Sequence, residues 1–230
     1  MSGSFEFSAS EGSDISSSLE VPRHFETLPD GRESLVIGDV EGLKDFNHLQ
    51  GENPLGFQGT CGIVSCEDVL HQFGNEGVSE GQLVEYAALH GLCNTEGAAG
   101  ECGGTTVSDQ ARILSDWGVP AGYESGVSLE SLAARVEEGR GVIAEVNSGT
   151  FWGQPSWSDL ILGGADHAVV ITGVARDPVS GEIQGFFVND SGVPSSGRFV
   201  DAATMQTAFT DAGGMAVTTT VPRNLASVLA

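Results

Sequence analysis

Basic residues are scarce in this chain of 230 residues. Nine lysines and arginines stand against 32 aspartates and glutamates, which gives a formal net charge of −23 at pH 7. A surface with this charge repels phosphate backbones and anionic membranes. We therefore expect neither a nucleic-acid-binding module nor a protein that binds lipid surfaces, whereas a very soluble protein or one with a basic partner fits the composition.

Long apolar runs are also missing, since no stretch reaches the ~18 residues of a membrane span. Residues 1–22 are rich in Ser, Gly and Glu, contain no basic residue and have no apolar segment of the kind found in classical secretion signals. The composition predicts a disordered acidic, Ser-rich arm over 1–22 and a single domain over 23–230. We expect a cytoplasmic location in the producing cell and any delivery to a target cell by a signal-peptide-independent route.

Cysteine is sparse, with four residues at positions 61, 66, 93 and 102. A domain of this size does not need disulfides for stability. A zinc site at His90, Cys93 and Cys102 would lack the two-residue cysteine spacing usual in such sites. Cys93 and Cys102 therefore form either a loop disulfide or two free thiols, and no metal or organic cofactor is implied.

The apolar pattern changes near the middle of the chain. Helical spacing and capping residues predict helices from Cys61 to Gly74 and near 80–91, 106–117 and 128–138. After Gly141, β-branched and aromatic runs predict strands, interrupted by a helix near 201–211. Pro29-Asp30-Gly31 predicts a hairpin over 24–40. The fold class is therefore α+β, with a helical N-terminal half packed on an antiparallel sheet formed mainly by the C-terminal half, and a cleft between them.

The stretch from Gly77 to Gly81 matches the G-x-S-x-G pattern of serine hydrolases. That pattern requires a strand before it and a helix after it, whereas here a predicted helix comes before it. Ser79, with Gln82 three residues later, instead predicts a capping box at the start of the second helix. We therefore discard the serine-hydrolase interpretation.

Three polar positions follow one another along the chain in the order of a cysteine-nucleophile site. Cys61 opens a predicted helix, His167 opens a predicted strand, and Asn189-Asp190 end the next strand. Taken singly, His167 is explained as an interior histidine and Asn189-Asp190 as ordinary turn residues. Together they have the chain order of a Cys-His-Asn/Asp site.

Each of these placements suits the chemistry. The positive end of a helix dipole favours the thiolate of a cysteine, which is the attacking species. A histidine takes up the proton and later gives it to the leaving group, while the third residue fixes the orientation of the ring. Cys66 lies five positions after Cys61, roughly 140° around the helix axis. We predict that Cys66 is a packed core thiol and that Cys61 is the nucleophile.

Four stretches resemble the papain-like cysteine peptidase superfamily. They are "TCGIVSCEDVLHQFG", "DHAVVITGV", "FFVNDSG" and "GGMAVTTTV", and the resemblance covers roughly residues 45–221. The nearest branch is the bacteriocin-processing peptidases that cleave double-glycine leaders, and papain-fold domains of bacterial polymorphic toxins share the pattern. The resemblance implies a papain-like fold, with Cys61, His167 and a residue at the end of the acidic strand in the catalytic site.

Two positions depart from the pattern of this superfamily. The oxyanion-hole glutamine usually lies about six residues before the nucleophile, where this chain has Leu55, while Gln58 and Gln50 lie three and eleven residues before Cys61. We assign Gln58 to the oxyanion hole, together with the backbone N–H of Cys61.

The third catalytic residue has two candidates. Papain itself uses an asparagine, which corresponds to Asn189, whereas the bacteriocin-processing branch uses an aspartate, which corresponds to Asp190. We prefer Asp190, because a carboxylate stabilises an imidazolium more strongly than an amide does.

We expect a cysteine peptidase that acts on a protein or peptide through a thioester acyl-enzyme. The long loop 147–164 carries Trp152 and Trp157, which either line the substrate cleft or attach the loop to the core. A deamidase or transglutaminase-like enzyme with the same triad, and an inactive papain-like module whose acidic face binds a basic partner, are the alternatives. The resemblance to toxin domains further implies a bacterial effector with an immunity protein as its inhibitor.

Overall fold

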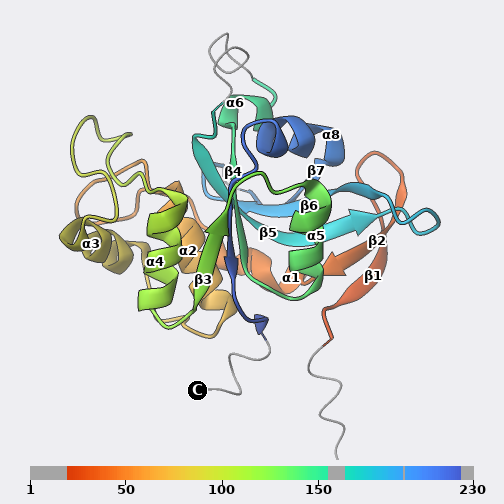
Figure 1. Cartoon of the computed structure of the whole chain (residues 1–230), viewed down its shortest axis with the longest axis horizontal. Coiled ribbons are helices and arrows are strands. Elements are labelled where there is room, and N and C mark those ends of the chain that lie inside the picture. Colours follow the sequence, from red (N-terminus) through yellow and green to blue (C-terminus); the bar gives the residue numbers. More distant parts are fainter. Residues whose placement is uncertain (1–19, 155–163, 194, 224–230) are drawn as a thin grey trace, which may run out of the picture.

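A branched antiparallel sheet of eight strands forms the centre of the molecule (Figure 1). The computed structural model describes residues 20–154, 164–193 and 195–223. The path of the sheet is β1-β2-β5-β4-β8-β3, and β6 pairs with both β5 and β7. The strands are β1 Arg23–Thr27, β2 Glu33–Gly38, β3 Ala121–Glu124, β4 Val142–Val146, β5 His167–Arg176, β6 Ile183–Asp190, β7 Ser195–Asp201 and β8 Ala216–Thr219.

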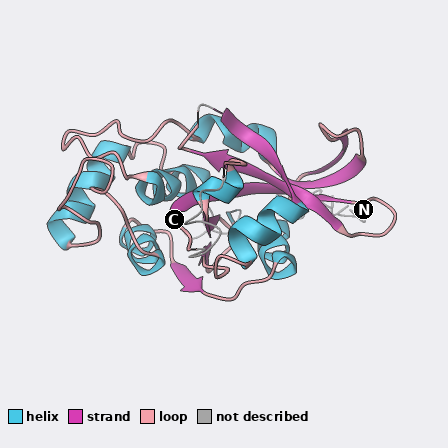
Figure 2. Ribbon diagram, turned by 90° about the horizontal axis from the view of Figure 1, so that it is seen from above, coloured by secondary structure: helices cyan, strands magenta, loops and turns pink. Residues whose placement is uncertain are grey.

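The longer helices of the N-terminal half gather beside this sheet. Figure 1 shows α2, α3 and α4 together at one end of the molecule, and Figure 2 shows the same group of helices beside the long strands. The helices are α1 Val40–Leu43, α2 Cys61–Gln72, α3 Glu80–His90, α4 Val107–Asp116, α5 Leu129–Glu137, α6 Ser148–Phe151 and α8 Ala202–Met205. A 3₁₀ turn, η2 Lys44–Phe46, follows α1, and a π-helical turn, η3 Gln206–Thr210, follows α8.

Both faces of the central strands are covered by apolar side chains. On β4, Val142, Ala144 and Val146 belong to a core that includes residues of α5 and α8. Ile143 of the same strand belongs to a second core built with α2, α3 and α4. This alternation follows the two-residue period of a strand. A sheet buried on both faces requires nearly continuous apolar strands, and nine of the ten residues of β5 are buried.

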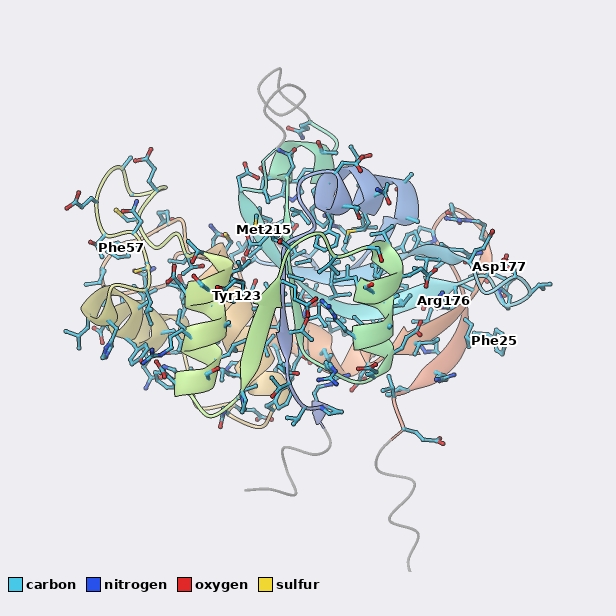
Figure 3. All side chains as sticks on the ribbon, in the orientation of Figure 1. Phe25, Phe57, Tyr123, Arg176, Asp177 and Met215 are labelled. Carbon is cyan, nitrogen blue, oxygen red and sulfur yellow. The ribbon has the colours of Figure 1, made fainter. Side chains whose placement is uncertain are left out.

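The predicted α+β class, with a helical first half and a sheet formed mainly by the second half, is confirmed by this architecture. Pro29-Asp30-Gly31 turns between β1 and β2, as the hairpin prediction required. Ser79 caps α3 in a complete capping box with Gln82. Figure 3 shows Phe57, which precedes α2, at the helical end of the molecule and Phe25 of β1 at the opposite end. In the part of the chain that the structure describes, no helix combines the length and apolarity that crossing a membrane requires.

All four cysteines are free thiols. Cys93 and Cys102 are therefore two free thiols in the structure and do not form the loop disulfide that was the other prediction. Cys66 is buried, and its Sγ donates to the backbone carbonyl of Gln110 at 3.7 Å. Burial raises the pKa of the Cys66 thiol well above its usual range. The predicted disordered arm lies almost entirely outside the described residues, which begin at Glu20.

Candidate active site

Cys61 is the first residue of α2, and the start of this helix is open. Thr60 occupies the N-cap position, but its side chain accepts no hydrogen bond from the first turn. Its Oγ1 instead donates to Glu80 Oε1 at 2.6 Å. The first turn of α2 contains no acidic residue. The N–H groups and the positive end of the dipole are therefore available to an anion or to the oxygen of a carbonyl group.

Glu80 fixes the loop in front of α2. Its carboxylate is buried and accepts hydrogen bonds from the backbone N–H groups of Gly51 and Glu52, at 2.9 and 2.8 Å. It also accepts from Asn53 Nδ2 at 3.1 Å and from the hydroxyl of Thr60. Four donors thus converge on one side chain at the start of α3. This arrangement fixes the position of the segment that leads to Cys61.

His167 begins β5 and is buried beside Cys61 and Asp190. Its Nε2 lies 2.7 Å from Asp190 Oδ1. Burial alone lowers the pKa of His167, but hydrogen bonds with Asp190 and Cys61 outweigh burial and raise the pKa to about 10. The geometry therefore favours an imidazolium between the thiol and the carboxylate.

Asp190 ends β6 and is completely buried. Besides His167, it accepts hydrogen bonds from the backbone N–H of Gly192 and from Trp152 Nε1, both at 2.9 Å, and from Arg198 Nη2 at 3.5 Å. Burial raises the pKa of Asp190, but the hydrogen bonds and the charge of His167 outweigh burial and lower it below its usual value. An ionised Asp190 can therefore orient His167 and stabilise its charge.

A cleft of about 330 Å³ lies between the helical side and the sheet. It brings together Cys61 and His167 with side chains from the loop before α2, from α4, β4 and α6, and from the chain that enters β5. The residues that line it are Gln50, Gly59, Cys61, Gly100, Gly104, Thr105, Gln110, Glu145, Ser148, Trp152, Ala165, Asp166 and His167. The predicted cleft between the two halves is therefore present, and the candidate nucleophile lies in it.

Of the two tryptophans that were predicted to line the cleft or to attach the loop to the core, the structure describes only Trp152. Trp152 is 38% exposed, lines the cleft, and has its ring centroid 5.1 Å from that of His167. The same indole donates to Asp190. Trp152 is therefore both attached to the candidate site and exposed in the cleft, while its role toward substrate stays a prediction. Trp157 lies outside the described residues.

The structure does not bring Gln58 into the cleft. Its side chain is exposed, and its Nε2 donates to the backbone carbonyls of Phe57 and Gly51 at 3.3 and 3.4 Å. Gln50 lines the cleft instead. Its Nε2 donates to the carbonyl of Gln58 at 2.6 Å, and its Oε1 accepts from Ser191 Oγ at 3.2 Å. Of the two glutamines, Gln50 and not Gln58 therefore lines the cleft with Cys61, although Gln50 lies further from Cys61 in sequence.

Asn189 and Asp190 point in different directions, as neighbours on a strand do. The amide of Asn189 donates to Asp68 Oδ2 at 2.7 Å and to the carbonyl of Leu43 at 2.9 Å. Asp190 alone of the two bonds His167. The geometry therefore favours Asp190 as the third residue of the site and gives Asn189 a structural role beneath it.

Sequence reasoning missed a second polar pair in the cleft. Gln110 of α4 is fully buried, and its Nε2 donates to Glu145 Oε1 at 2.5 Å and to Thr105 Oγ1 at 3.1 Å. Burial raises the pKa of Glu145 to about 7, against the opposing effects of Gln110 and of the charge of His167. The signal available in the sequence was a single charged residue in the otherwise apolar strand "VIAEV".

Comparison with known proteins identifies the fold. No model of a known protein family matches this chain, and no curated protein matches it. A solved structure described as a "putative C39-like peptidase from Bacillus anthracis" superposes with a TM-score of 0.53 at 16% sequence identity. The similarity covers 77% of this chain and 95% of that chain. The α+β architecture is therefore the papain-like fold of cysteine peptidases.

Proposed function

We propose that this protein is a cysteine peptidase that cleaves a protein or peptide substrate. The observation that carries the proposal is that Cys61 and His167 line one cleft, while the buried carboxylate of Asp190 bonds His167. Cys61 lies at the open start of α2, His167 lines the same cleft as Cys61, and Asp190 Oδ1 lies 2.7 Å from His167 Nε2. A nucleophile beside a base, with a third group orienting that base, is the arrangement that nucleophilic catalysis requires.

The chemistry follows from these positions. The Cys61 thiolate attacks the carbonyl carbon of the scissile bond, and the negative charge moves to the carbonyl oxygen. The Cys61 N–H at the start of α2 and Gln50, which lines the same cleft, are the proposed donors to this oxyanion. The carbon–nitrogen bond breaks as His167 gives its proton to the leaving amine, which leaves a thioester. His167 then takes a proton from water, the resulting hydroxide attacks the thioester, and the Cys61 thiolate is released.

Mapping new protein N-termini in a lysate exposed to the wild type and to Cys61→Ala tests the proposal. We expect new N-termini that require Cys61, and a loss of activity of about 10⁴-fold or more in the variant. Cys93→Ala is the matched control, because it removes a half-buried thiol that does not line the cleft. Targets that gain a negative charge without any fragment would indicate a deamidase. Fragments formed equally by Cys61→Ala would contradict the proposal.

The biological setting is proposed from the resemblance to toxin domains. We propose that the protein is a bacterial effector, cytoplasmic in the producing cell, delivered into a target cell without a signal peptide, and inhibited by an immunity protein. Expression of the wild type and of Cys61→Ala inside a bacterium tests this. Growth inhibition that requires Cys61 is expected, and equal growth would reject catalytic toxicity.

A further inference from the structure

Glu145 is the only charged residue of β4, and it lies on an otherwise apolar face. By strand alternation it shares a face with Ile143, which packs with Ala168 and Val170 in the core formed with α2, α3 and α4. Burial of a carboxylate costs free energy unless the group is well bonded. Here burial raises its pKa to about 7. An apolar residue at position 145 would extend the core, so the carboxylate needs a functional explanation.

The hydrogen bonding of Glu145 is half complete. Oε1 accepts from Gln110 Nε2 at 2.5 Å. Among the residues that the structure describes, no group donates to Oε2, although the side chain is partly exposed in the cleft. A carboxylate oxygen that lines a cleft without a donor is a site for a donor brought by a ligand.

Gln110 holds the carboxylate in this orientation. Its Nε2 is shared between Glu145 and Thr105, while its Oε1 is buried and has no partner within the described chain. Gln110 and Thr105 pack directly against Gly62, the residue that follows Cys61. A Cβ added to Gly62 would lie 2.1 Å from Thr105 Oγ1 and 2.6 Å from Gln110 Nε2. The carboxylate is therefore held by groups that contact the first turn of α2.

The charges around the cleft indicate which kind of substrate group would donate a hydrogen bond to Glu145 Oε2. The ionisable carboxyl groups that line it are Glu145 and Asp166. Asp166 is already bonded to the backbone N–H and the hydroxyl of Ser148, at 2.7 and 2.9 Å. The cationic side chain among the lining residues is His167, which is hydrogen-bonded to Asp190. Above the raised pKa of Glu145, a cationic side chain of the substrate would therefore meet a carboxylate whose Oε2 has no donor among the described residues, in a protein with a net charge of −23.

We propose that Glu145 forms the floor of a subsite that accepts a basic side chain, lysine or arginine, at one position beside the scissile bond of the substrate. The ammonium or guanidinium group donates to Glu145 Oε2, and Gln110 keeps Oε1 occupied and the carboxylate fixed. This inference rests on the proposed peptidase function, to which it adds the class of substrate. It assigns Glu145 to specificity and not to bond cleavage.

Peptides built on a sequence that the wild type cleaves test this subsite. At each position flanking the cleaved bond, lysine, arginine, norleucine and glutamate are compared by kcat/KM, with wild type, Glu145→Gln and Glu182→Gln. Glu182 is exposed before β6 and does not line the cleft, so its variant makes the same charge change as a control. We expect one position at which the wild type and Glu182→Gln prefer lysine or arginine over norleucine by roughly tenfold to a hundredfold, the effect of a charged hydrogen bond. Glu145→Gln should lose this preference, so that the ratio of its kcat/KM values on the lysine and norleucine peptides falls close to one.

The results of this experiment test the subsite proposal separately from the proposed peptidase function. A wild type that cleaves without any basic preference, or a Glu145→Gln variant that keeps the preference, overturns the subsite and leaves the peptidase intact. The wild-type profile alone can overturn the subsite, even if the variant does not fold.

If the wild type cleaves nothing, the proposed function fails, and binding then decides the subsite. Pools of labelled random peptides enriched in lysine or in glutamate are compared by fluorescence polarisation on Cys61→Ala and on Cys61→Ala/Glu145→Gln. Preference for the lysine pool that requires Glu145 supports the subsite, and equal binding of the two pools contradicts it.

Discussion

Thr60 and Thr106 are both threonines at the N-cap of a helix, but only Thr106 caps its helix. Thr106 accepts from the backbone N–H of Asp109 and completes a capping box at the start of α4. Thr60 donates its hydroxyl to Glu80 and leaves the first turn of α2 without a side-chain partner. The start of α4 therefore uses its orphan N–H groups for stability, whereas the start of α2 keeps them for a ligand.

The same contrast extends to what each helix start faces. The capping side chain Thr106 at the start of α4 is exposed, whereas Cys61 at the start of α2 lines the cleft with His167, which Asp190 supports. A helix end that gives up a cap loses about 1 kcal/mol of stability. We infer that α2 is stabilised instead by the Glu80 network and by its packing in the core. The comparison predicts that changes to the network before α2 affect activity, while loss of the Thr106 cap of α4 affects only stability.

Asp190→Asn is expected to have the largest effect among the variants that keep Cys61. An amide orients His167 less well and does not stabilise its charge, so kcat should fall by about 10³-fold or more. The raised pKa of His167 keeps the imidazolium up to about pH 10, so wild-type activity should be present below that pH and decline as the pH rises through it. In the variant, the alkaline limit should move toward the ordinary histidine value of about 6.5. A pH–rate profile from pH 5 to 11 measures both effects, and an unchanged alkaline limit would contradict the assignment.

Asn189→Ala is the matched control for that variant. It removes the donor to the buried carboxylate of Asp68 and should lower the free energy of unfolding by about 1–3 kcal/mol. Its alkaline limit should stay that of the wild type, because Asn189 does not bond His167.

Glu80→Gln is expected to have an intermediate effect that touches both stability and activity. The substitution removes the charge that four donors converge upon and should lower the free energy of unfolding by about 1–3 kcal/mol. Because the network positions the loop before α2, kcat/KM should also fall. Urea unfolding and peptide cleavage measure the two effects. Lowered stability with unchanged kcat/KM would show that the Glu80 network serves only the fold.

Thr106→Ala is expected to have the smallest effect. Loss of the cap of α4 should cost about 1 kcal/mol of unfolding free energy, without changing kcat/KM measured at a temperature where the variant is fully folded. A change in kcat/KM comparable to that of Glu80→Gln would remove the distinction between the two helix starts.

Much of the fold could be predicted because its elements carry strong local signals. The helices α2 to α5 have apolar spacing with capping residues or glycines at their ends, and β5 and β6 are long β-branched or aromatic runs. The strands that the sequence did not predict are β3 and β7. β3 is short, mostly exposed and at the edge of the sheet, and β7 is only half-buried. Neither shows a clear alternation, so their pairing depends on the rest of the sheet.

In the candidate site, too, some residues could be predicted from the sequence and others could not. The order of Cys61, His167 and Asp190 along the chain was readable, because each lies at the end of a regular element. Gln50 was not favoured, because its position depends on an irregular loop fixed by a carboxylate 30 residues later. The Gln110–Glu145 contact joins residues 35 apart in sequence, and no local pattern indicates such a pair. The catalytic roles of all these residues remain predictions.

The most direct test is the rate at which iodoacetamide alkylates each cysteine at pH 7, resolved by peptide mass spectrometry. The account predicts that Cys61 reacts fastest, that its rate falls in His167→Ala and Asp190→Asn, and that Thr106→Ala leaves the rate unchanged. Cys66, on the same helix but buried, should react only when the protein unfolds. Equal slow labelling of Cys61 and Cys66 in the folded protein would contradict the central claim that the open start of α2 presents an active nucleophile.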